Sequence, residues 1–110
     1  MNDTEYDSRV DAIFMQIEEA LDEIEANDEA DIDYESAEGI LTLEFVNRTK
    51  IILNKQPPLH QIWVATKFNG HHFNLEGEQW IDERFGAEFW AFIDDAVSKQ
   101  AEQPIKISGR

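Results

Sequence analysis

The sequence contains no cysteine, which excludes a disulfide framework, thiolate metal ligands and a cysteine nucleophile. It has no apolar run long enough to span a bilayer. Its first residues lack the basic and apolar regions of a signal peptide, so we expect a cytoplasmic protein. Basic residues are nearly missing from residues 1–38, which hold fifteen acidic residues against Arg9 alone. This segment therefore carries a net charge of −14, out of −15 for the whole chain.

The acidic excess bears on the kind of partner. Phosphate backbones and anionic lipid surfaces would be repelled, so we expect neither nucleic acid nor a membrane as a partner. Cations and basic protein surfaces would be attracted. Apolar residues make up 42% of the chain and include seven Phe and three Trp, enough to build one core. At 110 residues we expect a single domain over 1–110.

Hydrophobic periodicity predicts a helix at each end of the chain. From Asn2 to about Ala26, apolar residues recur at spacings of three and four, and Asn2 with Glu5 resembles a capping box. The same spacing predicts a second helix over Phe85–Gln100. Beyond it, Pro104 breaks the pattern, and residues 105 and 107 are both isoleucines that can pack on the core.

Alternating patterns between the helices predict short antiparallel strands. Residues 32–35 alternate first, and a loop at 46–48 then pairs Leu43 with Ile51 and keeps apolar partners on one face. A strand over 60–67 is expected to turn at Asn69-Gly70 and to place Val64 beside Leu75 and Thr66 beside Phe73. Residues 80 and 81 form a last short strand. The predicted architecture is α+β: two helices on one face of an antiparallel sheet of five to six strands, with the other face wet.

The acids of the first helix form a ridge. Asp11, Glu18, Asp22 and Glu25 share one flank, while Glu19 and Glu23 lie further round. Like-charge neighbours at these spacings disfavour a helix by roughly 0.2–0.5 kcal/mol each. The ridge is either a solvated face without a specific role or a surface for hard cations or a basic protein. Oxygen ligands suit Fe, Mn, Mg or Ca, but a calcium-binding loop starting at Asp31 lacks the required Gly and closing Glu.

Trp63 is the second notable feature, because the predicted pairing sets it among polar residues on the wet face. We interpret it as an interface anchor; the alternative is partial burial beneath the loop at Pro57 and Pro58. Asn54, Lys55 and Gln61 share this surface in the prediction. His60 is expected in the core and His72 outward opposite Lys67, while His71 has no assigned role. No catalytic triad, nucleophile elbow or phosphate loop appears, so we expect no enzyme activity.

The stretches "NKQPPLHQIWVATK" and "NGHHFNLEGEQWID", followed by a helix opening "GAEFW", closely resemble the bacterial frataxin (CyaY) family. The resemblance implies a frataxin-like α/β sandwich and a role in iron–sulfur cluster assembly. It also implies weak, exchangeable binding of ferrous and ferric iron, with other divalent cations as further ligands, and contact with the cysteine desulfurase and its scaffold protein. The metal-binding acids it implies are Glu18, Glu19, Asp22 and Glu23, with Asp3, Asp7, Asp31 and Asp33 nearby.

Three functional hypotheses follow from the residues and the resemblance together. The first is a non-enzymatic, iron-responsive modulator that docks through the ridge on the desulfurase. The second is an iron chaperone that delivers ferrous iron to the scaffold, and the third is a ferroxidase or iron store. We expect a monomer, with metal-induced oligomers as an alternative. The residues expected at the partner interface are Glu18, Glu19, Asp22, Trp63, Asn54, Lys55 and Gln61.

Overall fold

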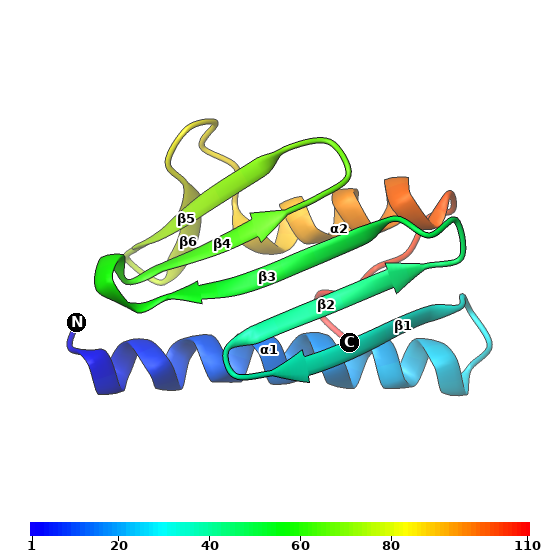
Figure 1. Cartoon of the computed structure of the whole chain (residues 1–110), viewed down its shortest axis with the longest axis horizontal. Coiled ribbons are helices and arrows are strands. Elements are labelled where there is room, and N and C mark those ends of the chain that lie inside the picture. Colours follow the sequence, from blue (N-terminus) through cyan, green and yellow to red (C-terminus); the bar gives the residue numbers. More distant parts are fainter.

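The computed structural model describes all 110 residues, which form one antiparallel sheet with two helices on a single face (Figure 1). The six strands lie in sequence order from β1 to β6, so each strand pairs with its neighbour along the chain. The predicted architecture is thus confirmed, with six strands. The elements are α1 (Asp3–Ala26), β1 (Ile32–Ala37), β2 (Ile40–Phe45), β3 (Lys50–Gln56), the 3₁₀ turn η1 (Pro57–Leu59), β4 (Gln61–Ala65), β5 (Gly70–Glu76), β6 (Gln79–Asp82) and α2 (Phe89–Ala101).

Helix α1 begins where its sequence predicts. The Asn2 side chain accepts a hydrogen bond from the Glu5 amide at 2.8 Å, which satisfies one of the free N–H groups of the first turn. The apolar stripe then faces the sheet, and every third or fourth residue from Tyr6 to Ile24 is buried. This leaves the acidic flanks of α1 at the surface.

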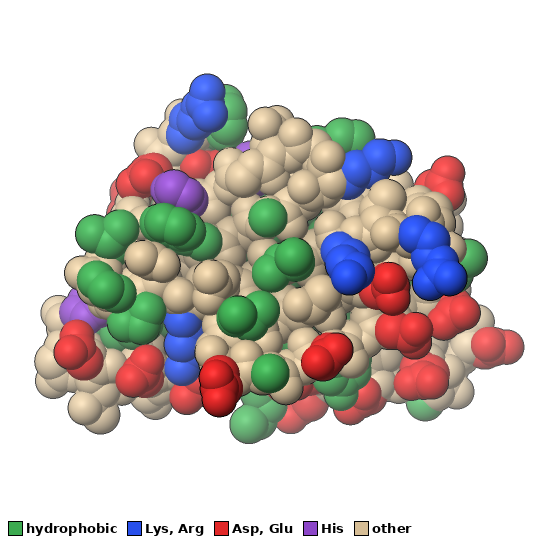
Figure 2. Space-filling view, in the orientation of Figure 1, with side chains coloured by type: hydrophobic (Ala, Val, Ile, Leu, Met, Phe, Trp, Pro, Cys, Tyr) green, Lys and Arg blue, Asp and Glu red, His purple; other side chains and the backbone are tan.

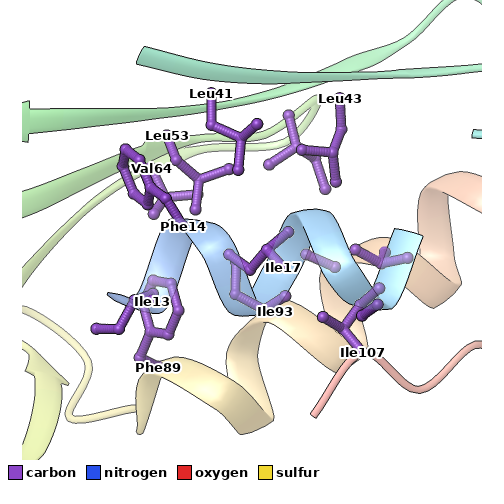
Figure 3. Close-up of a cluster of buried hydrophobic side chains, with 14 of the residues drawn as sticks. Ile13, Phe14, Ile17, Leu41, Leu43, Leu53, Val64, Phe89, Ile93 and Ile107 are labelled. Atoms are coloured by element: carbon purple, nitrogen blue, oxygen red, sulfur yellow. The ribbon is translucent and has the colours of Figure 1, made fainter. Parts of the chain in front are cut away.

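The core lies between the sheet and the two helices (Figure 3). Leu41, Leu43 and Leu53 point down from the sheet, while Ile17 of α1 and Ile93 of α2 point up toward them. Burying each such side chain contributes about 1.5–3 kcal/mol. The segment after α2 returns to this core through Ile105 and Ile107, which are both buried, so the predicted packing of the C-terminal segment is confirmed.

The hairpin between β2 and β3 has the predicted register. Leu43 pairs with Ile51 and Glu44 with Lys50. Leu43 and Ile51 are both buried against the helices, while their neighbours face the open side of the sheet. A hairpin one residue shorter would have turned the apolar residues to solvent, so burial fixes this register.

The predicted hairpin between β4 and β5 is wrong in its turn and register. The chain turns over residues 66–69 rather than at Asn69-Gly70, and Ala65 pairs with Gly70. The Thr66 hydroxyl accepts hydrogen bonds from the amides of Phe68 and Asn69, both at 3.1 Å. The Lys67 amide donates to the Gln100 side chain of α2 at 2.9 Å. These bonds satisfy the longer turn, and because the shift is even, every side chain keeps its predicted face.

Helix α2 begins later than predicted. Glu88 is its N-cap and accepts hydrogen bonds from the amides of Trp90 and Ala91, so the helix starts at Phe89 rather than Phe85. Phe85 lies in the preceding loop with 61% of its surface exposed. The cap therefore overrides an apolar spacing that continues backward into the loop. Neither helix has the length and apolar character needed to cross a membrane.

Candidate functional site: the acidic face of α1 and the open face of the sheet

One flank of α1 lies against β1. The Tyr34 hydroxyl of β1 donates a hydrogen bond to the Asp22 carboxylate at 2.8 Å. This bond, burial, and the nearby charges of Asp22, Glu18 and Glu25 raise the pKa of Tyr34, because they all disfavour a tyrosinate. Glu18, Asp22 and Glu25 thus form one negative surface along the α1–β1 edge, and only Asp22 has a hydrogen-bond donor within it.

The other flank of α1 faces the segment after α2. Glu19 and Glu23 line a small cavity of about 90 Å³ together with Trp90 and Ile107. Arg110 also lines it and reaches Glu23 at 3.3 Å and Glu29 at 2.6 Å. Its guanidinium holds the pKa of Glu29 below its usual range, chiefly through this hydrogen bond. The predicted ridge is therefore two flanks with different surroundings.

The acids in the first turns of α1 contact basic side chains of β3 and of the residue that caps η1. Asp3 lies 2.7 Å from Nε2 of His60, and the Lys55 ammonium lies 3.5 Å from Asp7 and 2.6 Å from Asp11. Burial disfavours the charged form of Lys55, but these carboxylates more than offset it and raise its pKa. Asp3 and Asp7 thus already have cationic or hydrogen-bonding neighbours.

Two predictions near this end of the molecule are wrong. His60 is not a core residue: it caps η1 in a left-handed conformation, outside β4, and stacks on Tyr6. Lys55 does not share the surface of Trp63, because it pairs with buried Ile62 and so points to the helix side. One residue of difference along a strand decides the face, and Asn54 takes the Trp63 side.

Asp31 and Asp33 lie apart from the α1 flanks. Asp33 pairs with Glu44 in the β1–β2 ladder, whereas its neighbour Tyr34 faces α1, so Asp33 belongs to the open face. With Glu44 and Arg48, both aspartates line a shallow depression at the sheet edge. No three His or acidic side chains of the chain converge as a metal-binding group. The eight predicted metal ligands are thus spread over four places, an arrangement that suits weak, salt-sensitive binding of several cations rather than one cage.

Trp63 lies on the open face, next to Asn54 of β3 and His72 of β5. The rings of Trp63 and His72 stack with centroids 4.2 Å apart, and the indole N–H donates to the Gln61 side chain at 2.7 Å. Gln61 itself is only 7% exposed and donates to Asn74 and Glu83. Trp63 is therefore half-buried by β5 rather than by the loop at Pro57 and Pro58, and His72 does not face Lys67 as predicted.

The middle of the open face is largely uncharged. Figure 2 shows acidic side chains gathered along the α1–β1 edge, at the lower right, and apolar and neutral surface in the centre. Ile40 and Ile52 are about two-fifths exposed there, at 40% and 38%. An acidic edge therefore adjoins a face with exposed apolar residues and a tryptophan, the composition of a protein-binding surface.

His71 and Asp82 form a pair that the sequence did not reveal. His71 Nδ1 lies 2.6 Å from a carboxylate oxygen of Asp82, whose side chain is fully buried. Burial by itself would raise the pKa of Asp82, but hydrogen bonds from the Arg84 amide, from His71 and from the Phe85 amide hold it below its usual range. His71 faces α2 and packs on Phe92, with ring centroids 4.4 Å apart. The pair anchors β5, β6 and α2 to one another.

Two side chains at these surfaces were not predicted from the sequence, Glu83 and Arg110, and His72 was predicted on the outer face but not beside Glu83. His72 lies in β5 and Glu83 directly after β6, eleven residues apart, and they meet only because β5 pairs with β6. Arg110 lies 81 residues from Glu29, and no local pattern links the two. The only signal for Arg110 was its positive charge in a chain with a strongly acidic first third.

Together, the fold and the two surfaces define a small α/β sandwich with an acidic helix and a tryptophan on an otherwise uncovered sheet. The chain belongs to the frataxin family: the model of the frataxin-like domain matches residues 1–103. Among curated relatives, the iron–sulfur cluster assembly protein CyaY of Pseudoalteromonas atlantica is 63% identical over 105 residues, covering 96% of this chain and 94% of the relative. The protein of the same description from Colwellia psychrerythraea is 51% identical over the full length of both chains. The resemblance seen in the sequence is thus confirmed.

Solved structures agree with the family assignment. Frataxin from Psychromonas ingrahamii, of the CyaY family, superposes with a TM-score of 0.87 at 42% identity, over 98% of this chain and 99% of the other. The trimeric frataxin of the yeast Saccharomyces cerevisiae, complexed with ferrous iron, has a TM-score of 0.70 at 29% identity, over 90% of this chain and 87% of the other.

Proposed function

We propose that this protein takes part in iron–sulfur cluster assembly as an iron-responsive modulator of the cysteine desulfurase and its scaffold. The acidic surface of α1 would dock on a basic patch of the desulfurase, and Trp63 with Asn54 would contact the assembly complex. The proposal includes that the protein acts in the cytoplasm and is not itself an enzyme. Family membership supports the process, since close relatives are described as iron–sulfur cluster assembly proteins.

The observation that carries the docking surface is a set of carboxylates without internal partners. Glu18, Glu19 and Glu25 lie on α1 and make no hydrogen bond or ion pair with another side chain, although their repulsion costs stability. Solubility alone would be served by mixed charges, which do not carry this cost. External cations, either iron or the basic side chains of a partner, would relieve the repulsion.

Weak iron binding fits the same surface. Carboxylate oxygens suit ferrous and ferric iron, but the open arrangement offers no enclosed coordination shell. Iron bound there would be exchangeable and would reduce the negative charge that attracts a basic partner. Iron occupancy would therefore alter docking, which makes the response to iron a consequence of shared carboxylates.

The test is titration of the desulfurase under anaerobic conditions, with and without ferrous iron, at two salt concentrations. We expect the variant E18K/E19K to weaken binding at least tenfold, because two attractions become repulsions. The matched control is E76K/E78K, which makes the same change in net charge at the β5–β6 turn. If both variants weaken desulfurase binding equally, the attraction depends on net charge alone and specific docking through α1 is refuted.

Two further outcomes separate the competing roles. Tight binding that ignores iron would mean a constitutive modulator. No binding under any condition would refute docking and favour an iron chaperone, which must pass iron to the scaffold faster than free iron reaches it in the presence of a chelator. If the protein docks as proposed, Trp63→Ala should weaken binding to the desulfurase–scaffold complex and leave iron binding unchanged.

A further inference from the structure

Arg110 lies against the end of the acidic surface with a defined geometry. Its two terminal nitrogens donate to the two carboxylate oxygens of Glu29, at 2.6 and 3.0 Å, and one of them also reaches Glu23 at 3.3 Å. This two-pronged contact matches a planar guanidinium and is not reproduced by an ammonium group. The Arg110 side chain is only 17% exposed, so it packs against the surface and does not extend into solvent.

The backbone that carries Arg110 is anchored separately from its side chain. Ile107 is buried in the core, and the amides of Ile107 and Ser108 donate to Asp94 of α2 at 2.8 and 3.0 Å. Gly109 follows, with a positive φ of 70° that turns the chain toward α1. The Arg110 Nε also donates to the Lys106 carbonyl oxygen at 2.5 Å, so a guanidinium that leaves Glu29 gives up this bond as well, while Ile107 and Ser108 stay anchored.

The negative charge of the carboxylates at this position exceeds the single positive charge of Arg110. Arg110 contacts Glu23 and Glu29, and Glu19 lines the small cavity beside them, so one guanidinium stands against two carboxylates with a third nearby. Trp90 lines the same cavity, and an aromatic ring is a favourable neighbour for a cation. We call Glu19, Glu23 and Glu29 the arginine seat.

We propose that the arginine seat binds an arginine side chain of a basic protein partner, and that Arg110 occupies the seat in the free protein and must leave it when the partner docks. The proposal rests on the proposed function for the identity of that partner, but not for the seat itself. Because the side chains of Glu23 and Glu29 are 51% and 34% exposed, a partner's guanidinium can reach the seat once Arg110 leaves it. Arg110 thus acts as an internal competitor that lowers the affinity of the acidic surface and favours arginine over lysine.

The test compares the unaltered protein with R110Q, using hexa-arginine and hexalysine peptides as probes. We expect R110Q to bind hexa-arginine about fivefold more tightly than the unaltered protein, since one competing surface pair is removed. Hexalysine should gain less than twofold, because an ammonium does not form the two-pronged contact. The matched control is K106Q, which changes the net charge equally at an exposed residue of the same segment, and it should change neither affinity beyond twofold.

Further variants locate the effect. In R110Q/E29Q the gain for hexa-arginine should disappear, because the accepting carboxylate is gone, and R110K should lie between R110Q and the unaltered protein. Equal gains in R110Q and K106Q, or a gain that survives E29Q, would overturn the proposal. An unchanged melting temperature and an unchanged Trp90 environment in R110Q would show that the segment stays folded. If the segment loosens in R110Q, R110K replaces it in the comparison. In R110K the affinity for hexa-arginine should still increase more than the affinity for hexalysine.

The desulfurase separates this proposal from the proposed function. If the peptides behave as expected but the desulfurase ignores both E18K/E19K and R110Q, the seat exists and the proposed partner is wrong. If the desulfurase responds to E18K/E19K but the peptides do not respond to R110Q, docking stands and the internal competitor is refuted.

Discussion

Two groups of carboxylates in this protein differ in how many donors reach them. At the end of β6, Asp82 accepts hydrogen bonds from His71 at 2.6 Å and from the Arg84 amide at 2.9 Å, and Glu83 accepts from Gln61, Asn74 and His72. On α1, by contrast, Glu18 and Glu19 accept from no side chain. The carboxylates of Asp82 and Glu83 hold β4, β5 and the end of β6 together, whereas those of α1 repel one another.

The difference shows that acidic residues of one small protein can have opposite effects on stability. A carboxylate that receives several donors stabilises the fold while it is ionised. A carboxylate that faces only others like it reduces stability and remains free for an external cation.

Asp82→Ala should have the largest effect. The change removes the acceptor of the Arg84 amide and of His71 from a fully buried position, and we expect a loss of about 3 kcal/mol in the free energy of unfolding. Urea denaturation measures the loss. Asp95→Ala is the control, because Asp95 is an exposed acid whose only ion pair, with Lys99, lies at the surface. Equal losses in the two variants would show that the donors at Asp82 contribute nothing special.

Neutralising the free acids of α1 should act in the opposite direction. The variant E18Q/E19Q/E25Q removes four near like-charge pairs, counting those with Asp22 and Glu23, so the protein should gain about 1–2 kcal/mol. Denaturation at low salt measures the gain, which should shrink as salt screens the repulsion. A loss of stability at low salt would mean that these glutamates have internal partners after all. Divalent cation should raise the melting temperature of the unaltered protein more than that of the variant.

Acid should reduce stability through the carboxylates that have donors. The pKa values of Asp82, Glu83 and Glu29 lie below their usual range in the folded protein, so their contribution is complete above the unfolded value of about 4. It is lost as the pH falls from about 4 through the lower folded values, because the folded state then takes up protons that the unfolded state already holds. Denaturation at pH 7, 5 and 3.5 measures the loss, and Asp82→Asn should lose less over the lower step. An identical pH dependence in this variant would contradict the assignment to Asp82.

Local patterns predicted most of the fold. The stripe from Tyr6 to Ile24 predicted α1, and the alternation on either side of residues 46–48 predicted both the β2–β3 hairpin and its register. These succeed because a period of 3.6 or 2 determines which side of an element can be buried, and burial of apolar surface is the dominant favourable contribution to folding. The turn at residues 66–69 was missed because a hydroxyl of Thr66 and a side chain from α2 stabilise it, and Gln100 is distant in sequence.

The candidate site was predicted less completely than the fold. The acidic character of α1 and the outward face of Trp63 follow from sequence and strand alternation alone. The two flanks of acids on α1 also follow from helical spacing, but the groups that pack beside them do not: Tyr34 lies on one side and Arg110 on the other.

The sequence by itself determined two helices, an antiparallel sheet and an excess of negative charge at one end, because each depends on residues close together in the chain. Only the tertiary structure decided which carboxylates have donors. His71 with Asp82, and Arg110 with Glu29, are 11 and 81 residues apart. Whether such groups meet depends on strand pairing and helix packing over the whole core, and hydrogen bonds act only over a few ångströms.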